Sequence, residues 1–194
     1  MWGDPHLTTL DAKTYSFNGH GEYTLLDIDN SYFRLQGRTM RAIRNGTASA
    51  LATVFTAFAA KQNDSDTIEA SLNSNNNGID IYVSNNSTSF PFSNIGENDT
   101  LSYNNVDLSR SNDGKLVMAF SSGISVEVQL LTEMLAVTFS APDTYKGNTK
   151  GLLGTWNDNM TDDFMRPNGT YLDISASESN IFYSFGQLCK LLYI

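Results

Sequence analysis

The sequence of 194 residues contains little cysteine, histidine or basic charge, and it has no long apolar run. Its single cysteine, Cys189, excludes an internal disulfide framework. Its two histidines, His6 and His20, are too few for a zinc site with three histidine ligands. No apolar run reaches the roughly 18 residues of a membrane-spanning helix, so no transmembrane span is predicted in this chain.

The charge balance and the absence of a catalytic motif exclude further classes of function. Twelve Lys and Arg against 21 Asp and Glu give a net charge of −9. This excludes nucleic acid as a partner, because such binding requires a basic surface, and it favours a cationic partner instead. No Gly-x-Ser-x-Gly element is present, so a hydrolase acting on another molecule has no motif to support it.

The patterns that are present indicate one domain with an all-β fold. Residues 124–130 alternate apolar and polar side chains strictly, which is typical of a strand with one buried face. Turn-forming residues separate this run from others like it, most clearly Ser111-Asn112-Asp113-Gly114. Short strands at such spacing predict an antiparallel β-sandwich or barrel.

Two segments have features that suit an α-helix. Residues 48–61 are rich in alanine, which suits a helix, but their β-branched and aromatic core favours a strand. We therefore predict a strand there. Residues 175–185 begin with Ser177 and Glu178 and carry an apolar face, which predicts a short C-terminal helix.

The most informative segment is the acidic stretch at residues 157–163, Asn-Asp-Asn-Met-Thr-Asp-Asp. Four of its side chains supply hard oxygen atoms, and Ca²⁺ prefers six to eight such ligands. The predicted ligands are Asn157, Asn159, Asp162 and Asp163. The alternative is a solvated turn, because Asn and Asp are also common turn formers.

A second cluster lies near the N-terminus, at Asp4-Pro5-His6. The Asp carboxylate can attack its own carbonyl carbon, and the proline nitrogen is a comparatively basic leaving group. An imidazole can act as a general acid, so His6 could supply the proton and the cluster is a candidate self-cleavage site. The alternative is a stiff turn that opens the first strand. Because Trp2 and Trp156 flank the two clusters, we expect the clusters to meet, with Asp4 as a further calcium ligand.

Glycosylation sequons indicate the cellular location of the chain. The acceptor asparagines are Asn45, Asn63, Asn85, Asn86, Asn98, Asn159 and Asn168, a modest excess over chance. The chain opens without a signal-peptide pattern. We therefore expect a glycosylated piece of a longer secreted or cell-surface protein, stabilised by a large core and calcium instead of disulfides.

Two segments of the chain together resemble a known family. One is residues 2–23, from Trp2-Gly3-Asp4-Pro5-His6 to Gly21-Glu22-Tyr23, and the other is residues 151–164, from Gly151-Leu152-Leu153-Gly154 to Asp162-Asp163-Phe164. They are similar to the opening and the calcium loop of a von Willebrand factor type D domain. The resemblance covers residues 2–185, and residues 186–194 form a divergent tail.

The departures from the family pattern are specific. Leu153 stands where most members have a cysteine, Thr155 where many have Asn, and Ala12 where Gly is usual. This cysteine-poor form is similar to the D domain of the transmembrane mucin with NIDO and AMOP modules and of its sushi-domain relatives.

The resemblance implies an extracellular, calcium-stabilised module used in adhesion, matrix or mucus assembly. Its partners would be other modules of the parent protein and glycoprotein or matrix components. It also implies that some relatives cleave themselves at the bond matching Asp4–Pro5.

Overall fold

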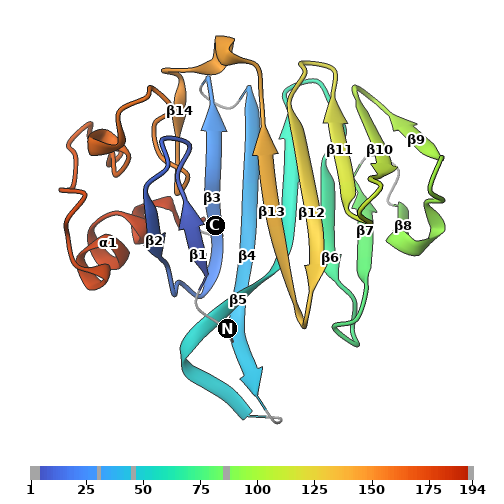
Figure 1. The fold of residues 1–194 in the computed structure, drawn as a ribbon, viewed down its shortest axis with the longest axis horizontal. Coiled ribbons are helices and arrows are strands. Elements are labelled where there is room, and N and C mark those ends of the chain that lie inside the picture. The colour runs from blue at the N-terminus through green and yellow to red at the C-terminus, as the bar shows by residue number, and fades with distance from the viewer. Residues whose placement is uncertain (1–4, 30–31, 45–46, 85–87, 192–194) are drawn as a thin grey trace. The chain divides into compact units, whose positions relative to one another are not determined.

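The computed structural model describes residues 5–29, 32–44, 47–84 and 88–191. Antiparallel strands make up 49% of it, and the one α-helix of the described residues, α1 (Glu178–Ser184), lies near the C-terminus (Figure 1). The predicted all-β fold with a short C-terminal helix is confirmed. Within the described residues, no helix is both long and apolar enough to cross a bilayer.

The chain forms two compact units. Residues 1–54 and 144–194 make the first unit, and residues 55–143 make the second. The long strand β5 (Thr47–Gln62) runs through the boundary, so its two halves belong to different units.

The first unit contains a hairpin, a sheet and the C-terminal helix. The hairpin pairs β1 (His6–Thr8) with β2 (Thr14–Ser16). The sheet contains, in order, β14 (Thr149–Lys150), β3 (Gly21–Ile28), β4 (Phe33–Arg44) and the first half of β5. Two 3-10 turns follow in the C-terminal part of this unit, η3 (Met160–Asp162) and η4 (Gly186–Cys189).

Aromatic side chains build the core of this unit beside the acidic segment. Phe164 is fully buried, and its ring centroid lies 5.1 Å from that of Tyr15 and 5.1 Å from that of Phe185. The hydroxyl of Tyr15, on β2, donates a 2.5 Å hydrogen bond to the carbonyl oxygen of Leu152. Because Phe164 follows the acidic segment directly, its burial draws the preceding Asp163 into the protein interior.

The second unit consists of two antiparallel sheets. One contains the second half of β5 with β6 (Ile68–Leu72), β7 (Ile79–Val83) and β8 (Thr88–Pro91). The 3-10 turn η1 (Phe92–Asn94) follows β8. The other sheet has the order β13 (Met134–Ser140), β12 (Ser125–Leu131), β11 (Leu116–Phe120), β10 (Val106–Arg110) and β9 (Thr100–Tyr103). The remaining 3-10 turn, η2 (Asp143–Tyr145), spans the unit boundary.

Several local predictions hold. The alternating run at 124–130 becomes β12, in which Val126 and Val128 are fully buried. Residues 48–61 lie in strand β5, as their β-branched and aromatic residues indicated. The helix α1 begins after Ser177, whose side chain accepts a hydrogen bond from the backbone N–H of Asn180.

Candidate metal centre

The candidate centre joins the β1–β2 hairpin to the acidic segment at residues 157–163. The hairpin turn is closed by backbone hydrogen bonds from Thr9 N to Lys13 O (2.8 Å) and from Ala12 N to Thr9 O (3.0 Å). Leu10 N donates to Leu153 O at 2.9 Å, which attaches the hairpin turn to the turn at residues 151–154 just before the acidic loop. Asp11 at the tip of the turn is thereby presented to that loop.

The carboxylate of Asp11 organises the loop backbone. Its Oδ2 accepts hydrogen bonds from the backbone N–H groups of Asn157 and Asn159, each at 3.0 Å. Its Oδ1 accepts a 3.0 Å hydrogen bond from the backbone N–H of Asp158. Three successive amides of the loop therefore converge on one carboxylate that lies about 150 positions away in the sequence.

Three carboxylates gather at this point. Asp11, Asp162 and Asp163 each place one oxygen within 4.8 Å of the oxygens from the other two. The Oδ1 atoms of Asp162 and Asp163 are buried, and among the described residues neither has a hydrogen-bond partner. An unpaired buried carboxylate oxygen is costly, so a bound cation, or a proton at lower pH, would stabilise this arrangement.

The other oxygen of Asp163 is satisfied within the protein. Its Oδ2 accepts a 2.6 Å hydrogen bond from the hydroxyl of Thr9. A Cβ added to Gly154 would collide with Asp163 Oδ1, and Gly154 has a φ of +81°. Glycine at this position therefore both permits the backbone conformation and leaves room for the carboxylate.

The electrostatics of the cluster disfavour three negative charges without a cation. Burial is the main cause that raises the pKa of Asp163 from its ordinary 3.8 to about 6. The hydrogen bond from Thr9 acts in the opposite direction, whereas the nearby charges of Asp11 and Asp162 raise the pKa further. A divalent cation would offset this repulsion.

The donor set fits a hard cation. All of the clustered atoms are carboxylate oxygens, with no nitrogen or sulfur among them, which is the chemistry that Ca²⁺ requires. The two buried oxygens without partners supply lone pairs that nothing else in the described structure uses. The residues present therefore fit calcium.

The predicted ligands Asn157 and Asn159 lie beside the cluster and hold the loop. Asn157 Nδ2 donates to Asp162 Oδ2 at 2.8 Å, while its Oδ1 accepts from the backbone N–H of Asn159 at 3.0 Å. Asn159 Oδ1 accepts hydrogen bonds from both the backbone N–H and the hydroxyl of Thr161, at 3.2 and 2.7 Å. Both amides thus fix the shape of the loop that presents Asp162 and Asp163.

The structure adds Asp11, which the sequence reasoning did not single out. The only sequence signal for Asp11 was its position within the family-like motif at residues 2–23. Asp4, predicted as the N-terminal ligand, lies outside the described residues.

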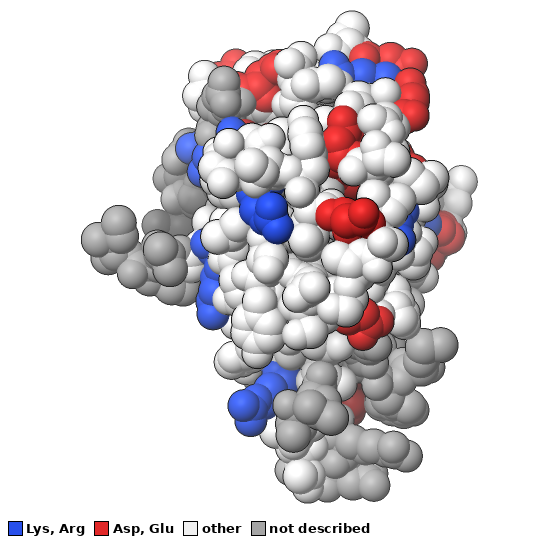
Figure 2. Space-filling view, turned by 90° about the vertical axis from the view of Figure 1, so that its left-hand side faces the viewer, with Lys and Arg blue, Asp and Glu red and all other residues white. Residues whose placement is uncertain are grey.

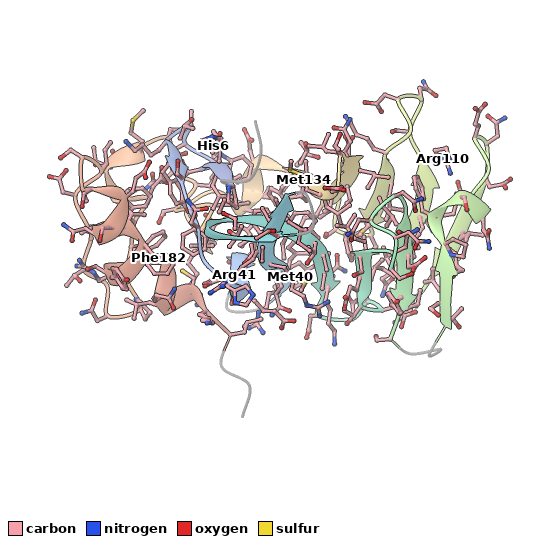
Figure 3. The ribbon with its side chains drawn as sticks, turned by 90° about the horizontal axis from the view of Figure 1, so that it is seen from below. His6, Met40, Arg41, Arg110, Met134 and Phe182 are labelled. Atoms are coloured by element: carbon pink, nitrogen blue, oxygen red, sulfur yellow. The ribbon has the colours of Figure 1, made fainter. Side chains whose placement is uncertain are left out.

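The residues proposed for self-cleavage are only partly described. Asp4 is outside the described part, whereas Pro5 and His6 are inside it. Pro5 O accepts a 3.0 Å hydrogen bond from Phe17 N, which fixes the start of the hairpin. His6 is exposed on β1, and its Nδ1 lies 3.3 Å from the hydroxyl oxygen of Ser16 (Figure 3).

Comparison with known proteins agrees with the two motifs. Residues 1–170 match the von Willebrand factor type D domain. The chain is 37% identical to Mucin-4 of Rattus norvegicus over 190 residues, which cover 94% of this chain and 8% of that protein. It is 29% identical to Sushi domain-containing protein 2 of Homo sapiens over 181 residues, covering 93% of the chain and 21% of the relative.

A third relative, Protein mesh of Bombyx mori, is 31% identical over 193 residues, which cover 91% of this chain and 12% of that protein. The chain therefore spans only a small part of the length of the curated relatives that it matches. The match covers the hairpin that carries Asp11 and the loop that carries Asp162 and Asp163. The chain belongs to the von Willebrand factor type D domain family, as the motifs at residues 2–23 and 151–164 predicted.

Proposed function

We propose that this chain is a calcium-stabilised structural and interaction module of a larger extracellular protein of the mucin-like or adhesion type. The family membership and the mucins among its relatives support this proposal. The small share of each relative that the chain covers indicates that it works beside other modules. Its partners would be these modules and glycoprotein or matrix components.

The observation that carries the calcium proposal is the pair of buried Oδ1 atoms without partners on Asp162 and Asp163. We infer that these two residues and Asp11 provide carboxylate ligands. The predicted ligands Asn157 and Asn159 would complete the shell or hold it in place, and Asp4 stays a predicted further ligand. The net charge of −9 supports cation binding as well, and Figure 2 shows Asp and Glu side chains, with Lys and Arg among them, on the face turned to the viewer.

Calcium would stabilise the folded state because the unfolded chain does not bring residues 11 and 162 together. The gain is RT ln(1 + [Ca²⁺]/Kd), about 2.7 kcal/mol when calcium exceeds Kd by a hundredfold. Extracellular sites often have a Kd in the range of roughly 10⁻⁴ to 10⁻³ M, so millimolar calcium would give a smaller but measurable gain.

The test is thermal unfolding of the chain in millimolar calcium and in chelator. We expect calcium to raise the Tm of the parent and of Asp158→Asn, and to leave the Tm of Asp163→Asn unchanged. Asp158 is the matched control because it lies in the same loop, is exposed and pairs with Lys146 at 3.1 Å outside the cluster. Equal Tm values of the parent in calcium and in chelator would overturn the proposal.

We propose self-cleavage at Asp4–Pro5 as a second activity, for which the exposed imidazole of His6 is the supporting observation. The Asp4 carboxylate would attack the carbonyl carbon of the same residue, and the Pro5 nitrogen would take a proton and leave as a secondary amine. Water would then open the cyclic anhydride. His6 would supply the proton to Pro5.

This second activity is tested with an N-terminal tag and incubation at mildly acidic pH. Tag release from the parent and from His20→Ala, but not from His6→Ala, is the expected result. His20 is the matched control because it is also exposed and belongs to the same unit. Equal release from His6→Ala and the parent would remove the role of His6.

A further inference from the structure

The second unit contains a pocket that the calcium proposal does not use. It lies where η1, the end of β10 and the turn between β6 and β7 meet, and it encloses about 400 Å³. This volume is at the lower end of the range for small-molecule sites. Arg110, Ser93 and Asn77 line it together with Ile79, Phe92 and Leu130.

Arg110 is held rigidly at the wall of the pocket. Its Nε donates to Ile95 O at 3.0 Å, and its Nη2 donates to Phe92 O at 3.2 Å. The guanidinium carbon lies 4.2 Å from the centroid of the Phe92 ring, so one face of the group rests on an aromatic surface. Figure 3 shows Arg110 at the end of the second unit, on β10.

The positive charge of Arg110 is not neutralised within the described residues. None of their carboxylates lies within 4.0 Å of it, although Asp and Glu outnumber Lys and Arg in the sequence. A guanidinium has five N–H donors, and the two carbonyl oxygens do not use those on Nη1. A planar group with an open edge is the arrangement that binds a carboxylate through parallel hydrogen bonds.

The other residues that line the pocket are uncharged and include both polar and apolar side chains. Ser93 supplies a hydroxyl, and Asn77 supplies an amide whose Oδ1 accepts from Asn73 Nδ2 at 3.0 Å, which leaves its Nδ2 as a donor. Ile79 and Leu130 supply apolar wall. A ligand that suits this lining is small, carries one carboxylate, and combines hydroxyl groups with an apolar ring face.

We infer that this pocket binds an acidic monosaccharide, with Arg110 holding its carboxylate and Ser93 and Asn77 contacting its hydroxyl groups. The site lies wholly in the second unit and is independent of the calcium cluster in the first. Binding at this pocket therefore stands or fails separately from the proposed calcium function.

The test is titration of the ¹⁵N-labelled chain with D-glucuronic acid, followed by NMR. D-glucose is the matched ligand control, because it has a hydroxymethyl group in place of the carboxylate. We expect shifts of the amides around η1 and residues 73–78 with glucuronic acid at about 10 mM or less, and none with glucose. Equal shifts with both sugars, or none with either, would overturn the proposal.

Substitutions of arginine test whether binding needs the positive charge of Arg110. Arg110→Gln should weaken glucuronic acid binding at least about tenfold, because it removes the charge and part of the fork. Arg38→Gln is the matched control, since Arg38 already pairs with Glu22 at 2.7 Å in the first unit, and it should bind as the parent does. If Arg110→Gln fails to fold, the glucose comparison on the parent decides alone. Sulfate that competes at the same concentration as glucuronic acid would reduce the pocket to a general anion site and overturn the sugar assignment.

Discussion

The Thr9 hydroxyl donates a 2.6 Å hydrogen bond to Asp163 Oδ2 across 154 positions of sequence. Both residues are buried, and the other oxygen of Asp163 has no partner in the described structure. Thr9 therefore supplies a short internal hydrogen bond to this carboxylate, in addition to the one from the backbone of Thr155.

Replacing Thr9 by Val should destabilise the calcium-free protein by about 1–3 kcal/mol, because it removes a 2.6 Å hydrogen bond from the buried carboxylate of Asp163. Urea unfolding in chelator measures the effect. Thr8→Val is the control, since Thr8 is exposed and its hydroxyl lies 3.5 Å from that of Thr14, and it should change the free energy of unfolding little. Equal effects of the two substitutions would contradict the role of Thr9.

The calcium-free protein should become more stable relative to Asp163→Asn as the pH falls from 7.5 to 5. The folded-state pKa of Asp163 is about 6, which is above its ordinary 3.8, so the folded state binds the proton more tightly than the unfolded state. Its charge thus costs stability above pH 6, by up to about 3 kcal/mol, and this cost is relieved between pH 6 and 4. Unfolding in chelator at both pH values checks this; a parent-minus-variant difference that is constant with pH would refute it.

Gly154→Ala should destabilise the chain more than Gly147→Ala does. Both glycines have a φ of +81°, so both substitutions carry the same cost of roughly 1 kcal/mol for a left-handed backbone. A Cβ at Gly154 also collides with Asp163, whereas one at Gly147 meets nothing within 4 Å. We expect an additional loss of about 1–3 kcal/mol and weaker calcium-dependent stabilisation for Gly154→Ala only. Similar unfolding curves for the two variants would show that the collision is relieved without cost.

Ala12→Gly should stabilise the protein. Ala12 has a φ of +70° at the exposed tip of the hairpin turn, a conformation that costs a non-glycine residue about 1–2 kcal/mol. The added freedom of glycine in the unfolded chain offsets part of this gain, which leaves roughly 0.5–1 kcal/mol.

Ala119→Gly is the opposite control for this prediction. Ala119 is an exposed residue within strand β11, so its replacement should lose about 0.5–1 kcal/mol. Chemical denaturation of both variants measures the two signs. A loss of stability in Ala12→Gly would mean that the turn does not carry the strain that its backbone angle indicates.

Sequence reasoning predicted the elements whose local pattern is strong. The strict alternation at 124–130 predicted a strand, which the structure contains as β12. The predicted turn at Ser111–Gly114 is present and closes through a 2.9 Å hydrogen bond from Gly114 N to Ser111 O. Strands β6, β9 and β10 were missed, because each has only four or five residues and mixes polar residues with its few apolar ones.

The residues of the candidate metal centre could likewise be predicted only where they form a local pattern in the sequence. Asp162 and Asp163 were found because they stand close together in a polar segment. Asp11 was missed because its partners are backbone N–H groups of residues 157–159, and no local pattern records a contact of that length. Only the folded chain places the hairpin turn against the loop.

The attachment of Asp11 to three main-chain amides has a consequence for how this loop tolerates change. Every amino acid except proline offers the same N–H group, so the anchor is indifferent to the side chains at 157–159. The amides of Asn157 and Asn159 shape the loop through their own hydrogen bonds, so this tolerance applies to position 158, whose exposed side chain pairs with Lys146 outside the cluster. Replacing Asp158 by Asn, which also adopts a positive φ, would remove a charge while the loop keeps its attachment to the hairpin.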